Sequence, residues 1–261
     1  MNYYLTQEMS ERVILRLKEF HKNLNELYIQ YDINICDDIC RRNALMSHAQ
    51  EKFFAEELRS IYPTAHSDGR TGHADIEIPE ISQEIECKIT TRRKKGGFSL
   101  QADYASLKRK GELDFLYVLT DSEFNKFAVL HFSSLTVEDF FKPSPGSRGK
   151  SKMNKTLGMK KCKVLLGTIT TRNEIELEKL AEKIKSTSKK KVERINEIDQ
   201  KISTLGVRAH KRRQFLHGLL KKERARFDKK ISTFSKREKY WKTASKKFSI
   251  GLFDSNGLDH F

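Results

Sequence analysis

Residue types that can bind a metal ion and stabilise charge on a phosphate occur at a suggestive spacing in the first half of the chain. Asp75 is followed, after ten intervening residues, by Glu86, and Lys88 comes two residues later. Apolar alternation around these residues predicts two adjacent strands, with Glu86 and Lys88 on one face and Asp75 close to both. Neighbouring carboxylates repel one another unless a cation lies between them, and hard cations such as Mg²⁺ prefer oxygen ligands. We therefore predict metal-assisted attack on a phosphate, with Lys88 orienting a water and stabilising the developing charge.

Hydrophobic periodicity indicates the elements that must position these residues. Apolar residues at three- and four-residue steps predict amphipathic helices, whereas strict alternation predicts strands with one buried face. The pattern predicts helices over 13–31, 43–62 and 99–110, and strands over 74–78, 81–89, 115–119, 127–132 and 163–168. This order is typical of an α/β fold, with a mixed β-sheet core flanked by helices.

At these residues the sequence resembles the PD-(D/E)XK nucleases, the superfamily that contains most type II restriction endonucleases. The resemblance is carried by His73-Ala74-Asp75-Ile76-Glu77-Ile78 and Glu84-Ile85-Glu86-Cys87-Lys88-Ile89, within a region of about residues 45–135. It implies a restriction-endonuclease-like core, with Asp75 and Glu86 as metal ligands, Lys88 as the catalytic lysine, and Mg²⁺ as the cofactor with Mn²⁺ as a substitute. In many relatives a Glu of the preceding helix completes the site. Glu51 is our choice for that role, with Glu56 and Glu57 as alternatives, and Ala74 departs from the family pattern where its name has Pro.

Other carboxylates compete for the same roles. Glu77 shares a strand face with Asp75, and Glu84 shares one with Glu86. The Glu-x-Lys spacing favours Glu86, and the strand geometry then favours Asp75. The competing interpretation of the whole set is a solvent-facing row of charged strand residues without catalytic function.

Weaker signals flank this region. His66 and His73 lie on either side of a turn-rich loop, where contact with a phosphate or a base competes with a role as ordinary surface residues. Asp68 is most simply a turn residue, with metal ligation as the alternative. Cys36 and Cys40 share one helix face without a second pair of ligands, so we predict that they contribute to core packing.

The charge of the chain is unevenly distributed. The formal net charge is +16, yet residues 1–141 sum to −5 and residues 142–247 to +23. Clustered Lys and Arg bind a polyanion because they release counterions from a phosphate backbone, whereas a solvated Lys-rich helix surface is the alternative. We predict DNA contacts from the basic residues after the second strand and from a mobile basic loop at 142–163, namely Arg92, Arg93, Lys94, Lys95, Arg148, Lys150 and Lys152.

Two helical stripes follow this loop, and a break near Gly206 separates them. They predict an antiparallel, coiled-coil-like helical hairpin at about 174–247 with basic outer faces. We therefore divide the chain into a nuclease domain over 1–170 and a basic helical arm over 171–261, which binds DNA or dimerises.

Taken together, the sequence predicts a Mg²⁺-dependent endodeoxyribonuclease acting on double-stranded DNA, of the type II restriction class. Symmetric cleavage would then require a homodimer or sequential nicking by a monomer. The alternatives are a structure-selective nuclease such as a junction resolvase, and a non-catalytic DNA-binding protein whose hairpin clamps DNA or dimerises. RNA is a further candidate substrate, but no RNP-type aromatic motif supports it.

Composition limits the cellular setting. The chain has 261 residues, four cysteines and no long apolar run, and its mean hydropathy is −0.66. A spanning helix needs roughly 18 to 20 consecutive apolar residues, so we expect no membrane partner. Too few cysteines are present for a disulfide framework, and we expect a reducing, cytoplasmic location in a prokaryote or phage.

Overall fold

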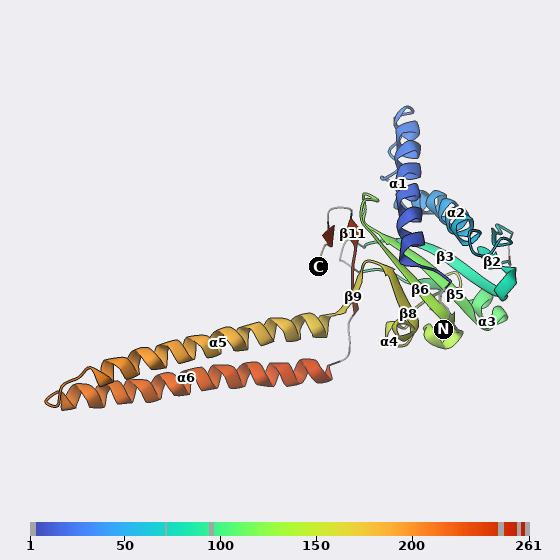
Figure 1. Ribbon diagram of the computed structural model, residues 1–261. Helices are drawn as coiled ribbons and strands as arrows, with labels where there is room; N and C mark the ends of the chain where they lie inside the picture. The colour runs from blue at the N-terminus through green and yellow to red at the C-terminus, as the bar shows by residue number, and fades with distance from the viewer. Residues whose placement is uncertain (1–3, 71, 94–96, 245–247, 255–256, 259–261) are drawn as a thin grey trace. The chain divides into compact units, whose positions relative to one another are not determined.

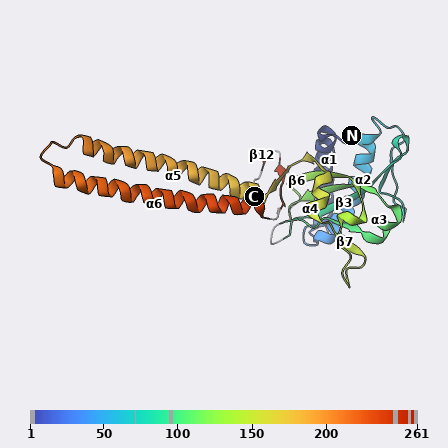
Figure 2. The ribbon, with the colours of Figure 1, turned by 90° about the horizontal axis from the view of Figure 1, so that it is seen from below.

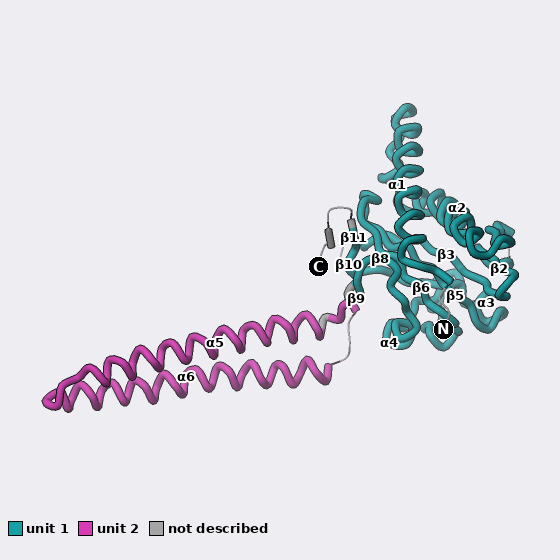
Figure 3. The backbone as a smooth tube through the Cα atoms, viewed as in Figure 1, with its two compact units in different colours: residues 1–169, 249–261 teal, residues 170–248 magenta. Residues whose placement is uncertain are grey.

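The computed structural model describes residues 4–70, 72–93, 97–244, 248–254 and 257–258. The chain forms two compact units: residues 1–169 together with 249–261, and residues 170–248 (Figure 3). Within the described residues, no helix combines the length and apolar character that a membrane span requires.

The first unit is a mixed α/β structure, as the periodicity predicted. Its α-helices are α1 (Gln7–Ile29), α2 (Ile39–Leu58), α3 (Tyr104–Lys110) and α4 (Lys155–Gly158). Three short 3₁₀ turns are η1 (Pro79–Ile81), η2 (Val137–Asp139) and η3 (Met159–Lys161). Its strands are β1 (His66–Ser67), β2 (Ile76–Ile78), β3 (Gln83–Thr91), β4 (Gln101–Asp103), β5 (Leu113–Thr120), β6 (Phe127–Leu135), β7 (Lys150–Lys152), β8 (Cys162–Leu166), β11 (Phe253–Asp254) and β12 (Gly257–Leu258), while β9 (Thr168–Thr171) and β10 (Phe248–Gly251) lie at the unit boundary.

The main sheet is mixed and has the strand order β1-β2-β3-β5-β6-β11-β12, with β8 also paired to β6 (Figure 1). β3 and β5 are parallel, and every other pairing between the described strands of this sheet is antiparallel. All eight residues of β5 are buried. Such an unbroken buried run is typical of a central strand that is covered on both faces.

Helices α1 and α2 cover one face of this sheet (Figure 1). Each begins at a side chain that caps its free N–H groups: Thr6 accepts from Met9 N, and Asp38 accepts from the N–H groups of Cys40 and Arg41. Their apolar stripes form one core with alternate residues of β2, β3 and β5, such as Ile76. The helix predicted over 43–62 is thus α2, which begins at Ile39 and ends at Leu58, four residues earlier than predicted at each end.

The opposite sheet face is covered by shorter elements, and here the structure differs from our prediction. Residues 101–103, expected within a helix, form β4, which pairs antiparallel with β7. The segment 142–163, expected to be a mobile loop, contains β7, α4 and η3. Local periodicity missed β4 and β7 because each has only three residues, too few for alternation to be read.

The second unit consists of two long helices, α5 (Arg172–Ser203) and α6 (His210–Thr243), which lie side by side in both views (Figure 2). A capping box at Thr171 and Glu174 begins α5, and the Asn173 amide donates to the carbonyls of Trp241 and Ala244. The predicted helical hairpin is thus present, with its turn at residues 204–209. The apolar stripes of the two helices are not buried throughout, because Val192 and Phe215, which belong to them, are 57% and 69% exposed.

The first unit ends at residue 169 and resumes at residue 249, so residues 249–261, which we assigned to the arm, group with the first unit. Ile250 and Leu252 are buried there, and Phe253 pairs with Phe127 of β6. Gly167 packs closely against this segment, because a Cβ atom added at Gly167 would lie 2.6 Å from the Gly251 carbonyl oxygen. The hydrophobic periodicity of the sequence does not predict that residues 249–261 pack against the first unit.

Candidate active site

The structure brings Asp75, Glu86 and Lys88 together. Asp75 immediately precedes β2, and the register of β2 and β3 pairs Ile76 with Ile85. The Asp75 Oδ2 atom accepts a hydrogen bond of 2.7 Å from Cys87 N. Lys88 Nζ lies 2.6 Å from Glu86 Oε1 and 3.6 Å from Asp75 Oδ2. One ammonium group therefore bridges two carboxylates, one from β3 and one from the residue just before β2.

Glu51 of α2 belongs to the same cluster. Burial, together with the charge of Asp75, raises the pKa of Glu51 to about 7, although Lys88 and a hydrogen bond from Ser47 oppose the shift. Glu86 also contributes to this rise. The charges of both other acids therefore act on the Glu51 carboxyl.

The two alternative acids on α2 pair with residues of α1 instead. Glu56 forms an ion pair with Arg16 of α1, and Glu57 forms one of 2.8 Å with Arg12. Both acids are thus used in the contact between α1 and α2. Glu51, by contrast, is subject to the charge of Asp75, which raises its pKa.

The remaining charges of the cluster affect each other strongly. Burial raises the pKa of Glu86, an effect that Lys88 opposes and Asp75 reinforces. Burial alone would lower the pKa of Lys88, but Glu86 and Asp75 outweigh it and the net shift is upward. The ammonium therefore stays charged, and the carboxyl groups of Glu51 and Glu86 retain more protons than isolated ones would. A site of this kind favours an additional cation.

A pocket of about 340 Å³ opens beside Glu86 and Lys88. Its opposite wall is the β4–β7 ribbon, which contributes Gln101 and Lys150. Tyr117 of β5 lines the base and donates a hydrogen bond of 2.8 Å to the Gln101 carbonyl. Sequence reasoning did not find Tyr117, because within an all-apolar strand nothing distinguishes it from a core residue.

The predicted DNA-contacting residues fall into separate places. Lys150 lines the pocket beside Glu86, and together with Lys152 it lines an adjacent hollow. Arg148 is exposed just before β7. Arg93, which follows β3, is exposed too. Arg92 donates its backbone N–H to the Thr120 carbonyl, while Lys94 and Lys95 lie outside the described residues.

Arg93 also lies near a second cation. Burial lowers the pKa of Lys155 in α4, and the charge of Arg93 adds to that decrease. Two neighbouring positive charges are costly in isolation and are relieved by an anion.

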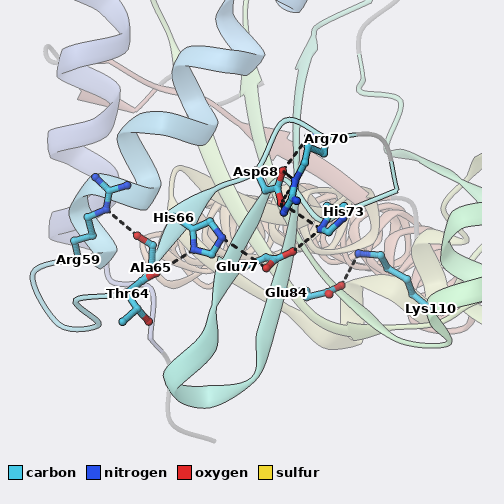
Figure 4. A network of polar contacts seen from close by, with 10 residues as sticks. All are labelled: Arg59, Thr64, Ala65, His66, Asp68, Arg70, His73, Glu77, Glu84 and Lys110. Carbon is cyan, nitrogen blue, oxygen red and sulfur yellow. Dashed lines mark hydrogen bonds and ion pairs between the residues drawn. The ribbon is translucent and has the colours of Figure 1, made fainter.

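The competing carboxylates are engaged elsewhere. Glu84 pairs with Lys110 of α3 at 2.5 Å. Glu77 lies between His66 and His73, in the network drawn in Figure 4. Neither acid is among the groups that perturb Glu51, Glu86 or Lys88 most strongly.

The donor chemistry of the cluster fits a hard divalent cation. Asp75, Glu86 and Glu51 supply carboxylate oxygens, the ligands preferred by Mg²⁺ and Mn²⁺. The pocket beside them has space for a phosphate and presents two ammonium groups, those of Lys88 and Lys150. Comparisons of this chain with protein-family models, with curated proteins and with solved structures find no match.

Proposed function

We propose that the protein is a metal-dependent endodeoxyribonuclease that hydrolyses phosphodiester bonds in double-stranded DNA. The observation that carries this proposal is the bridging of Asp75 and Glu86 by the ammonium of Lys88 beside an open pocket, with Glu51 of α2 subject to the charges of all three. The resemblance of the same residues to the PD-(D/E)XK pattern supports it. That resemblance also makes the type II restriction endonuclease the preferred class.

Each residue has a defined role in this proposal. Asp75, Glu86 and Glu51 would hold Mg²⁺, which supplies Lewis-acid polarisation of a phosphoryl oxygen and lowers the pKa of a bound water. Lys88 remains protonated because Glu86 and Asp75 raise its pKa, so it donates hydrogen bonds to the attacking water or to the phosphoryl oxygens on which negative charge develops. Lys150, across the pocket, positions a neighbouring phosphate.

Helix α6 provides the main non-specific attraction for DNA. It contains 13 Lys and Arg against three Asp and Glu, whereas α5 contains nine against seven. The three acids of α6 already form ion pairs, with Lys191 of α5 and with Arg226 and Lys242 of α6. The positive charge assigned to the hairpin thus lies almost entirely on α6, which is suited to track a phosphate backbone.

Cleavage of a supercoiled plasmid tests the proposal. The chain should nick or linearise DNA with Mg²⁺ and leave it intact with EDTA. Glu86→Gln should reduce the rate by at least about 100-fold, comparable to the removal of one transition-state interaction. Glu84→Gln is the matched control, because Glu84 lies two residues away on the same face of β3 but pairs with Lys110.

Unchanged metal-dependent cutting by Glu86→Gln would overturn the assignment of the site. Absence of cutting by the wild-type chain, with salt-sensitive binding of duplex DNA retained, would favour the non-catalytic alternative in which the arm clamps DNA or dimerises. Digestion of a long natural DNA separates the enzymatic alternatives. Discrete fragments indicate a recognition sequence, whereas cleavage confined to branched substrates indicates a junction resolvase.

A further inference from the structure

A second polar cluster lies on β1, β2 and the loop between them, and the proposed nuclease reaction does not use it. Its members are His66, Asp68, His73 and Glu77 (Figure 4). One donor atom from each of His66, Asp68 and Glu77 lies within 4.8 Å of the others. This set combines imidazole nitrogens with carboxylate oxygens, unlike the all-oxygen set around Lys88.

The donor separations match those around a small tetrahedral ion. His73 Nδ1 lies 3.2 Å from Asp68 Oδ2 and 3.3 Å from Glu77 Oε1, and His66 Nε2 lies 3.7 Å from Glu77 Oε2. Zn²⁺ binds His nitrogen and carboxylate oxygen at about 2.0–2.2 Å, so ligand atoms at the corners of its tetrahedron are roughly 3.3–3.6 Å apart. The donors of His66, Asp68 and Glu77, all within 4.8 Å of one another, can therefore meet on one ion after small side-chain rotations, and His73, which contacts Asp68 and Glu77, is placed to supply a fourth ligand.

A hydrogen bond to the backbone fixes the orientation of the His66 ring. Its Nδ1 lies 3.0 Å from the Thr64 carbonyl oxygen, which can only accept, so Nδ1 carries the proton. In the neutral ring, Nε2 then presents a lone pair towards Glu77, at a distance too long for a hydrogen bond. An imidazole whose far N–H is held by a backbone carbonyl is the usual arrangement of a metal-binding histidine.

Arg70 currently provides the positive charge for Asp68. Its Nε lies 2.9 and 3.0 Å from the two carboxylate oxygens, and its backbone N–H donates to Oδ1. The Asp68 side chain is only 6% exposed, whereas that of Arg70 is 72% exposed. The guanidinium can therefore swing away at little cost, while the carboxylate stays directed into the cluster.

From this geometry we propose a second metal site, for Zn²⁺ or a similar transition-metal ion, with His66, Asp68, His73 and Glu77 as ligands. Mixed nitrogen and oxygen ligands select such ions over Mg²⁺. The ion would connect β1 to β2 and the loop between them. The Asp68 N–H donates to the Asp75 carbonyl at 3.1 Å, so an ion bound to Asp68 would also stabilise the backbone that positions Asp75.

Metal binding by the purified full-length chain tests this site. Equilibrium dialysis against Zn²⁺ in excess Mg²⁺, which competes for the all-oxygen cluster, should leave one Zn²⁺ per chain. Co²⁺ in its place should give the intense visible absorption of tetrahedral coordination. His66→Ala and Glu77→Gln should each weaken Zn²⁺ binding by at least about tenfold.

Two further variants separate this site from a loss of folding or from the nuclease cluster. Arg70→Ala should bind Zn²⁺ more tightly, because it removes the cation that competes for Asp68. His48→Ala, which changes an exposed histidine of α2, and Glu86→Gln should bind as the wild type does. Less than one Zn²⁺ per wild-type chain, or undiminished binding by both ligand variants, would overturn the proposal. Since the readout is metal content, its failure is distinguishable from a failure of nuclease activity.

Discussion

Asp75 and Cys87 are 12 positions apart in the sequence, yet the carboxylate of the first accepts a 2.7 Å hydrogen bond from the backbone N–H of the second. This bond joins the two halves of the candidate site and places Asp75 beside both Glu86 and Lys88. A one-residue slip of β3 would exchange its two faces, burying Glu86 and exposing Cys87. The register of β2 and β3 is therefore what assembles the site.

Replacement of Lys88 should couple stability to metal binding. Lys88→Gln leaves Asp75 and Glu86 without their shared ammonium, so we expect a loss of about 1–2 kcal/mol in EDTA, allowing for the partial exposure of these groups. Mg²⁺ should restore much of this stability, while DNA cleavage stays at least about 100-fold reduced. Urea unfolding with and without Mg²⁺ measures the effect.

Lys110→Gln is the matched control, because its ammonium pairs with Glu84, which is 45% exposed. It should cost less than about 1 kcal/mol and show no dependence on Mg²⁺. Equal responses of the two lysine variants to Mg²⁺ would contradict the role of Lys88.

The pKa of Glu51, near 7 in the folded chain, predicts a pH-dependent stability difference. Below its unfolded value of about 4.5, both states hold the proton and no difference arises. Between that value and about 7, the unfolded state ionises first, so folding becomes less favourable as pH rises. Without metal, Glu51→Gln should therefore be more stable than the wild type at pH 8, relative to their difference at pH 4.

Thermal unfolding of the wild type and of Glu51→Gln in EDTA from pH 4 to 8 measures this difference in stability. Mg²⁺ at pH 8 should remove the stability advantage of the variant, because Mg²⁺ binds the Glu51 carboxylate of the wild type more strongly than the neutral amide that replaces it. Glu84→Gln again serves as the control. Parallel curves for wild type and Glu51→Gln would mean that Glu51 is not desolvated beside Asp75.

Charge on α6 should dominate binding of duplex DNA. Replacing Lys221, Lys222 and Arg224 by Gln should weaken binding and reduce the slope of log K against log salt by about 0.9 for each phosphate that is no longer neutralised. The same change at Lys183, Lys185 and Lys190 of α5 is the control, since all six side chains are exposed. Fluorescence anisotropy at several salt concentrations compares the two triple variants. Equal losses of affinity would show that the hairpin acts through its net charge and not through α6.

A buried polar network should stabilise the first unit. Asp114 Oδ2 accepts from the Tyr4 hydroxyl at 2.5 Å and contacts His131 Nε2 at 2.8 Å, while Oδ1 accepts from Ser134 N. Asp114→Asn should cost about 2–4 kcal/mol, since the buried network loses its negative charge and one of its two acceptor oxygens. Tyr4→Phe, which removes one donor, should cost about 1–2 kcal/mol.

The sign of the pH dependence distinguishes this network from simple packing. Burial raises the pKa of Asp114, but hydrogen bonds from His131, Tyr4 and Ser134 outweigh it and the net shift is downward. The contribution is therefore complete above the unfolded value of 3.8 and declines as pH falls towards the lower folded pKa. The stability difference between wild type and Asp114→Asn should shrink across that acid range.

Several features could be predicted from the sequence because they depend on local periodicity. Alternation along β3 is sufficient to place Glu86 and Lys88 on one face, opposite the buried Cys87. Three- and four-residue steps likewise indicate α1, α2 and the helices of the arm. These patterns report which side of an element is buried, and that property belongs to neighbouring residues.

Tertiary structure alone decided how distant segments meet. It selected Glu51 from three acids on α2, since ion pairs with α1 occupy Glu56 and Glu57. It brought Lys150 to the pocket beside Glu86 through the pairing of β4 with β7, and it returned Ile250 and Leu252 to the first unit. Such long-range pairings depend on strand register and on packing summed over the whole core, which no local pattern encodes.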